Sequence, residues 1–177
     1  DDETGLKDPI GMSGVRLEVE AHLVTASVTT ARNIYRSLER CRVGVDHIVL
    51  EALGLSHVLL SEEELSIGAV LVDIGGDITS IALFSEGAIR NTATIPLGGR
   101  NVTNDIAIGL RTTLDQAEEL KMIHGAAIAS MVDPEEMVNV AGIAGRASRD
   151  ISRNVLASII EPRMEEIFSL VGRELKK

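Results

Sequence analysis

The stretch AVLVDIGGDITSIALF, residues 69–84, is the part of this 177-residue chain that decides the fold. An apolar run ends at Asp73, the pair Gly75 and Gly76 follows, and a second apolar run begins near Thr79. Two apolar runs joined by a glycine turn predict a β-hairpin with the glycines at its tip. Asp73 and Thr79 are then expected at the ends of the two strands that meet this turn.

The residues after the hairpin predict a third strand and two helices. AIRNTATIPLGG (88–99) is a predicted strand that ends in another Gly-Gly pair, so that three strands form a meander. NVTNDIAIGL (101–110) and TLDQAEELKMIH (113–124) are predicted helices, the second opened by a capping box between Thr113 and Gln116.

The residues before the hairpin predict a strand, a helix and a strand, in that order. Apolar and polar residues alternate over 15–23, which is the pattern of a half-buried strand. Thr29 or Thr30 is the predicted N-cap of a helix, and VDHIVLEA (45–52) is a predicted second strand. The acidic stretch SEEEL (61–65) is predicted to be the solvated end of a short helix, or a loop.

The remainder of the chain is predicted to be mostly helical. From Ser148 onward apolar residues recur at helical spacing, and Pro162 marks a kink or the first turn of a new helix. The predicted apolar stripe consists of Ile151, Val155, Ile159, Met164, Ile167, Phe168, Val171 and Leu175.

Composition and charge restrict the class of protein. Apolar residues make up 45% of the chain and aromatic residues only 2%, so a core must be built from aliphatic side chains, as in buried strands covered by helices. The formal charge of −10 and the absence of a Lys/Arg cluster argue against nucleic acid as a partner. Cys41 is the only cysteine and no apolar run reaches the length of a membrane span, so we expect a soluble cytoplasmic chain.

The order D-x-G-G-x-x-T at the predicted hairpin tip suits phosphate binding. A carboxylate at a strand end can hold the water shell of Mg²⁺, glycines let backbone amides approach phosphate oxygens, and a hydroxyl donates a further hydrogen bond. Asp73, Gly75, Gly76 and Thr79 supply these groups. The residues by themselves also allow a plain glycine turn, in which Asp73 and Thr79 only satisfy the backbone.

Motifs over nearly the whole chain carry a resemblance to one family. VDIGGDITSIALF is similar to the second phosphate loop of the superfamily of actin, heat-shock chaperones and sugar kinases. IPLGGRNVTNDIAIGLRTTLDQAEELKMIHGAA (95–127) resembles the bacterial cell-division proteins of the FtsA family, and DPIGMSGVRLEVEAHLVTA (8–26) resembles the strand that closes their extra SHS2 subdomain. The resemblance implies a partial α/β fold of the actin-like, ribonuclease H-like ATPase type. Its implied parts are the end of the SHS2 subdomain (1–26), the closing part of the first lobe (27–67) and the opening part of the second lobe (68–177).

The same resemblance implies a site for ATP and Mg²⁺. Asp73 would hold the metal through water, the loop would surround the β- and γ-phosphates, and a helical pair would contact the nucleoside. The implied nucleotide-binding residues are Asp73, Gly75, Gly76, Thr79, Gly98, Gly99, Glu118 and Lys121. By spacing alone, Glu118 and Lys121 share a helical face and also fit a plain ion pair, and the second Gly-Gly pair fits either an anion nest or only a turn.

The loop departs from the superfamily pattern, usually Asp-Ile-Gly-Gly-Gly-Thr-Thr-Asp, at three positions. Asp77 replaces the third glycine, Ile78 a threonine and Ser80 an aspartate. Asp77 brings a negative charge beside a polyphosphate, where the repulsion amounts to about 1 kcal/mol or more. Unless the Asp77 side chain turns away from the phosphates or helps to hold Mg²⁺, we expect weakened nucleotide binding and at most weak ATPase activity in an intact protein. The chain by itself is expected to have no ATPase activity, because the resemblance implies that it supplies only one side of the nucleotide cleft.

The family's activity implies partners. A complete member is implied to carry an earlier phosphate loop, a later adenosine motif and a membrane anchor, to polymerise, and to tether the FtsZ ring to the inner face of the cytoplasmic membrane. Residues 126–177 would belong to the region that receives the C-terminal tail of FtsZ, and the SHS2 subdomain would contact other division proteins.

Two alternatives of other classes stay open at this point. A PilM-type pilus-assembly adaptor shares the fold but would lack the Ala-Glu-x-x-Lys-x-x-His-Gly order found at residues 117–125. An actin-fold sugar kinase or chaperone ATPase would need a sugar-binding acid or a peptide-binding domain, and the sequence shows neither.

Overall fold

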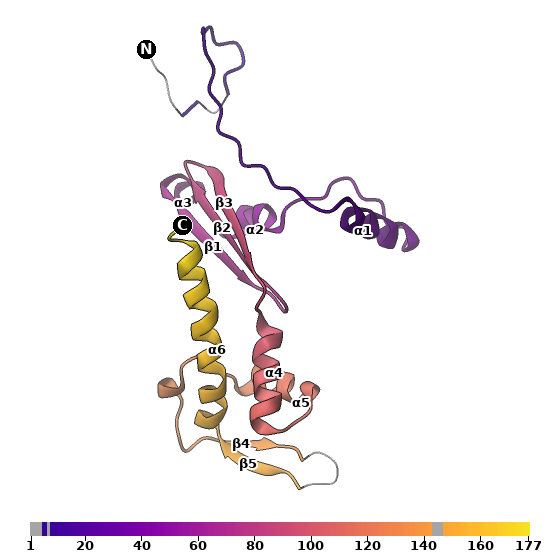
Figure 1. The fold of residues 1–177 in the computed structure, drawn as a ribbon, viewed down its shortest axis with the longest axis vertical. Helices are drawn as coiled ribbons and strands as arrows, with labels where there is room; N and C mark the ends of the chain where they lie inside the picture. Colours follow the sequence, from indigo (N-terminus) through magenta and orange to yellow (C-terminus); the bar gives the residue numbers. More distant parts are fainter. Residues whose placement is uncertain (1–4, 7, 143–146) are drawn as a thin grey trace. The chain divides into compact units, whose positions relative to one another are not determined.

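The computed structural model describes residues 5–6, 8–142 and 147–177 (Figure 1). The chain forms two compact units. One comprises the residues up to Leu71 together with 82–92, and the other comprises 72–81 together with 93–177. The lobe boundaries predicted at residues 26 and 67 remain a prediction.

A three-stranded sheet forms as the sequence predicts. Its strands are β1 (Ala69–Ile74), β2 (Thr79–Ser85) and β3 (Ala88–Ile95), in the order β1-β2-β3. The connections at residues 75–78 and 86–87 are too short for crossovers, so neighbouring strands are antiparallel. The predicted hairpin and meander are therefore confirmed, and residues 75–78 form the turn between β1 and β2.

Three helices of the first unit precede this sheet in the sequence: α1 (Val28–Arg40), α2 (Glu51–Leu59) and α3 (Glu62–Ile67). The N-cap of α1 is Ser27 and not Thr29 or Thr30, because the Ser27 hydroxyl accepts from the Thr30 amide. A capping box between Ser61 and Glu64 opens α3 and confirms the predicted short helix.

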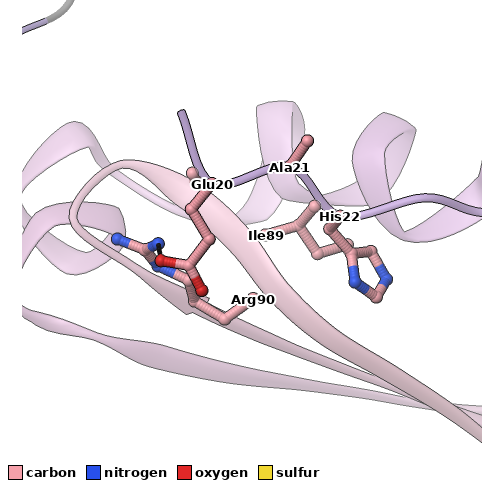
Figure 2. Close-up of a pocket in the computed structure, with 6 residues that line it drawn as sticks. Glu20, Ala21, His22, Ile89 and Arg90 are labelled. Atoms are coloured by element: carbon pink, nitrogen blue, oxygen red, sulfur yellow. Dashed lines mark hydrogen bonds and ion pairs between the residues drawn. The ribbon is translucent and has the colours of Figure 1, made fainter. Parts of the chain in front are cut away.

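The strand predicted over residues 15–23 is wrong. This segment is irregular, and its apolar side chains Val15, Leu17, Val19 and Leu23 are exposed. A strand needs a neighbour for its backbone hydrogen bonds, and within the described ranges no backbone group pairs with this segment. Side chains make its contacts instead: Glu20 Oε2 lies 3.0 Å from Arg90 Nη1 of β3. Figure 2 shows these two side chains pointing toward each other.

The strand predicted over residues 45–52 is also wrong, because residues 45–50 are irregular and Glu51 begins α2. A short apolar run cannot be assigned to strand or helix by periodicity alone. Here packing decides: Ala52 and Leu53 of α2 lie in a small core with Ala82 and Phe84 of β2.

The second unit contains the helices α4 (Gly99–Leu110), α5 (Leu114–His124) and α6 (Arg153–Glu174) (Figure 1). Aliphatic side chains of all three helices form its main core, which is centred on Ile106 and Leu156. Thr113 caps α5 by accepting from the Gln116 amide, but the Gln116 side chain bonds Thr112, so only half of the predicted capping box exists. Among the described residues, no helix is long and apolar enough to cross a membrane.

The prediction that the residues between α5 and α6 are mostly helical is wrong. After the short 3-10 helix η1 (Ala129–Met131), β4 (Met137–Val140) pairs antiparallel with β5 (Arg149–Ser152). Val138 and Val140 of β4 point into the main core, so the period-two alternation at this strand was a usable signal.

The buried face of α6 also differs from the predicted stripe, although the helix itself continues through Pro162. Val155, Phe168 and Leu175 of the predicted stripe are exposed. The buried residues of this helix are Leu156, Ala157, Ile160, Ile167 and Val171.

Candidate functional site

The turn between β1 and β2 is bonded directly to the start of α4, and both elements lie in the second unit. The Gly75 amide closes the turn by donating to Ile78 O at 2.9 Å. The amides of Gly99 and Arg100 then donate to the carbonyls of Gly75 and Gly76, at 2.8 and 2.7 Å. Two backbone hydrogen bonds therefore hold the predicted phosphate loop against the first turn of a helix.

Gly98 makes this close approach possible. Its backbone is extended (φ −163°), which any residue adopts, so its role is not conformational. A Cβ at this position would lie 2.5 Å from Gly75 O and 2.7 Å from Gly76 O. The position thus requires glycine because two backbones touch there.

The second Gly-Gly pair has no amide left for an anion in this arrangement. Gly98 N donates to the side chain of Asn101 at 3.0 Å, and Gly99 N donates to Gly75 O. The anion-nest interpretation of Gly98 and Gly99 is therefore corrected: the pair forms a packed turn that supports the loop.

Three successive amides at the tip of the loop have no such partner. In the described part of the chain, no acceptor takes a hydrogen bond from the amides of Gly76, Asp77 or Ile78. Space is open beside Gly76, where an added Cβ would meet nothing within 4 Å. This tip, and not the whole glycine run, is the part of the loop that can approach phosphate oxygens.

Asp73 lies at the end of β1, next to the loop, and is half-buried. No described residue donates a hydrogen bond to its carboxylate or pairs with it. No cluster of three or more His, Cys, Asp or Glu residues that could enclose a metal exists among the described residues. A carboxylate in this position would suit Mg²⁺ if the turn binds phosphates, because Mg²⁺ keeps most of its waters and takes further oxygens from the phosphates.

The predicted role of Thr79 as a phosphate donor is corrected. Thr79 is fully buried, and its hydroxyl donates to Leu97 O at 2.9 Å. A hydroxyl has one hydrogen, so this bond leaves none for a phosphate. Thr79 instead ties the start of β2 to the residues that lead into Gly98.

Glu118 and Lys121 of α5 lie together, with 2.7 Å between Lys121 Nζ and Glu118 Oε2. Lys121 also donates to Gly99 O at 3.2 Å and to the hydroxyl of buried Thr103 at 2.9 Å, and Thr103 in turn bonds Glu118. The hydrogen bonds from Lys121 and then Thr103 lower the pKa of Glu118 below its ordinary value of 4.5. The plain ion pair that their spacing allows is therefore present, and it is connected through Gly99 to the loop. Contact of this pair with a nucleoside stays a prediction.

Thr103 and Arg100 are two residues of this region that the sequence interpretation missed. Thr103 occupies one face of α4 with Gly99 (i, i+4), and this spacing was a usable signal. Arg100 pairs with Asp77 at 2.9 Å, and nothing in the sequence between these two positions indicates that they meet.

The fold resembles solved actin-like proteins. The MreB5 protein of Spiroplasma citri, in a structure bound to AMPPNP, matches with a TM-score of 0.72 at 20% identity, over 86% of this chain and 48% of that one. A PilM-PilN type IV pilus biogenesis complex matches with a TM-score of 0.59 at 17% identity, over 82% of this chain and 35% of the other. The chain thus has the α/β fold of the actin-like ATPases.

The sequence then places the chain within that class. The family described as cell division protein FtsA matches residues 70–176, and the SHS2 domain inserted in FtsA matches residues 1–25. This chain belongs to the FtsA family. The cell division proteins FtsA of Pseudomonas aeruginosa and Neisseria meningitidis are 46% and 42% identical to it over all 177 residues. The chain spans only 42% and 43% of the length of these two relatives.

Proposed function

We propose that this chain supplies the second-lobe side of an ATP-binding site in an actin-like cell-division adaptor. The β- and γ-phosphates would bind at the tip formed by Gly76, Asp77 and Ile78. Mg²⁺ would be held through water by Asp73, and the nucleoside would lie against Glu118 and Lys121. The observation that carries this proposal is the hydrogen-bonded connection between the two groups of residues.

The phosphate side is supported by the backbone. Three successive amides, for which the described residues offer no acceptor, form a concentration of partial positive charge, and such an arrangement suits an anion. The carbonyls of Gly75 and Gly76 face the other way, since they accept from the first turn of α4. The loop is therefore held in place before any ligand arrives, which lowers the entropy cost of binding.

The nucleoside side is supported by the side chains of α5. Glu118 is about half-exposed, with 45% of its side chain accessible, and its lowered pKa keeps it ionised, so it can accept hydrogen bonds from ribose hydroxyls. Lys121 is more buried and holds Glu118 from one side. Lys121 also donates a hydrogen bond to Gly99 O, and Gly99 N donates to Gly75 O. Hydrogen bonds therefore connect the residues that would bind a nucleoside on α5 with the loop that would bind the phosphates.

Nucleotide binding is better supported than hydrolysis. The Asp73 carboxylate is assigned to the metal. The Thr79 hydroxyl already donates to Leu97 O, and the side chain of Ile78 has no hydroxyl. We therefore propose at most weak ATPase activity, with ATP acting to order the protein or promote its self-association.

Titration calorimetry on the full-length gene product tests the site. Wild-type protein should bind ATP in a Mg²⁺-dependent manner. Asp73→Ala should weaken that binding at least tenfold, about 1.4 kcal/mol or more, because it removes the carboxylate placed for the metal. Glu118→Ala should weaken it as well. Glu119→Ala is the matched control on the same helix, since Glu119 is exposed and its side chain bonds no described residue. Equal affinities of wild type and Asp73→Ala would remove Asp73 from the site.

We further propose that the complete protein tethers FtsZ to the inner face of the membrane and assembles into filaments, with residues 126–177 in the region that receives the FtsZ tail. Family membership supports this proposal. Purification of the tagged full-length protein should recover FtsZ. Recovery of inner-membrane pilus proteins without FtsZ would favour the pilus adaptor instead.

A further inference from the structure

Asp77 and Arg100 form an ion pair on the rim of the candidate site. Arg100 Nη1 lies 2.9 Å from Asp77 Oδ1, and the two side chains are 68% and 64% exposed. An exposed pair of this kind contributes little to stability. The ion pair instead changes the net charge next to any ligand that binds the loop.

Both residues are fixed next to the amides that face the proposed phosphates. The amide of Asp77 is one of the three that donate to no acceptor in the described part of the chain, so a phosphate bound there would lie beside the Asp77 carboxylate. The amide of Arg100 donates to Gly76 O at 2.7 Å, which places the start of its side chain one hydrogen bond away from the same turn. The positive charge of Arg100 also contributes to the lowered pKa of Glu118, after the larger effects of the Lys121 and Thr103 hydrogen bonds.

We propose that Arg100 is a phosphate-site cation that offsets Asp77, and that this pair sets how strongly the loop binds the polyphosphate of a nucleotide. This inference rests on the proposed function and adds a residue to it. An unpaired Asp77 would repel a bound polyphosphate, whereas Asp77 paired with Arg100 presents little net charge. A guanidinium has five N–H donors, and the pair engages one nitrogen, so further donors can reach a phosphate oxygen.

A double-mutant cycle on the full-length gene product tests the pair. The variants are Arg100→Ala, Asp77→Gly and the double substitution, with Arg100→Lys as the charge-conserving variant. Dissociation constants for Mg-ATP and Mg-ADP are measured by calorimetry at low and high salt, and circular dichroism checks that each variant folds. Both side chains are exposed, so folding is expected to be retained.

The expected result is coupling between the two positions. Arg100→Ala should weaken Mg-ATP binding on the order of tenfold, as one charge interaction at a surface site would. The double substitution should recover most of this loss, and Arg100→Lys should lose less than Arg100→Ala. The loss should be larger for ATP than for ADP and smaller at high salt, because charge is its cause.

Two results would overturn the inference while leaving the proposed function intact. Wild type and Arg100→Ala could bind Mg-ATP equally, or the double substitution could be as weak as Arg100→Ala alone. A wild-type protein that binds no Mg-ATP would instead overturn the proposed function, and this inference with it.

Discussion

Gly98→Ala is the substitution whose effect follows most directly from the geometry. The new methyl carbon would lie 2.5 and 2.7 Å from two backbone oxygens of the loop, well inside van der Waals contact, and neither oxygen belongs to a movable side chain. The loop and α4 must therefore separate. Separation stretches the two hydrogen bonds that Gly99 N and Arg100 N donate to the loop.

The cost has two parts. Overpacking a tight site costs about 1–3 kcal/mol, and each weakened backbone hydrogen bond costs about 0.5–1.5 kcal/mol. Since relaxation relieves one part at the expense of the other, we expect a loss of about 2–4 kcal/mol of unfolding free energy. A loss of this size lowers the unfolding temperature of the second unit, residues 72–81 and 93–177, by at least about 8 °C.

Thermal unfolding of the 177-residue chain, followed by helical circular dichroism, measures the effect. Gly76→Ala is the matched control, because Gly76 lies in the same loop, has no positive φ, and would place its Cβ in open space. We expect Gly76→Ala to change the free energy of unfolding by less than about 0.5 kcal/mol. If Gly98→Ala is equally harmless, or if both substitutions destabilise alike, the loop and α4 are not in the tight contact described above.

Three further predictions concern the ion pairs and the isolated chain. The pKa of Glu118 is lowered in the folded chain, so its contribution to stability is present above the ordinary value of 4.5 and is lost as the pH falls through the folded pKa. The urea midpoints of wild type and Glu118→Gln should therefore converge in acid. A difference that does not change with pH would contradict this. Arg163 of α6 holds Asp105 of α4 through bonds of 2.7 and 3.1 Å. Arg163→Met should therefore lower the free energy of unfolding by about 1–2 kcal/mol, and Arg163→Lys should lower it less. An unchanged urea midpoint for Arg163→Met would show that this ion pair does not stabilise the fold. The isolated chain, which supplies one side of the proposed site, should bind Mg-ATP with a dissociation constant of about 1 mM or weaker by calorimetry, and a value near about 10 μM would mean that the site is self-contained.

The local parts of the fold could be predicted from the sequence. The glycine turn at 75–78, the cap at Thr113 and the Gly125 end of α5 are each encoded within a few residues, and all three are present. The segments 15–23 and 45–52 could not be assigned, because a strand depends on a neighbour that lies elsewhere in the chain. Local pattern says which residues alternate, but not whether another strand accepts their hydrogen bonds.

In the candidate site, too, some features could be predicted from local sequence and others depend on tertiary packing. Asp73, Glu118 and Lys121 are where their spacing places them. The burial of Thr79 and the contact of Gly98 with the loop depend on distances between β3, α4 and the β1–β2 turn. The pairing of Asp77 with Arg100 likewise joins residues from two elements. A sequence motif names the chemical groups of a site, but tertiary packing decides which of their hydrogen bonds are already used.

A crystal structure of the full-length gene product with Mg²⁺ and a non-hydrolysable ATP analogue would show directly whether the loop and α5 bind nucleotide. We predict phosphate oxygens on the amides of Gly76, Asp77 and Ile78, a metal-bound water on Asp73, and ribose hydroxyls on Glu118. A nucleotide bound without contact to the 75–78 turn or to α5 would contradict it.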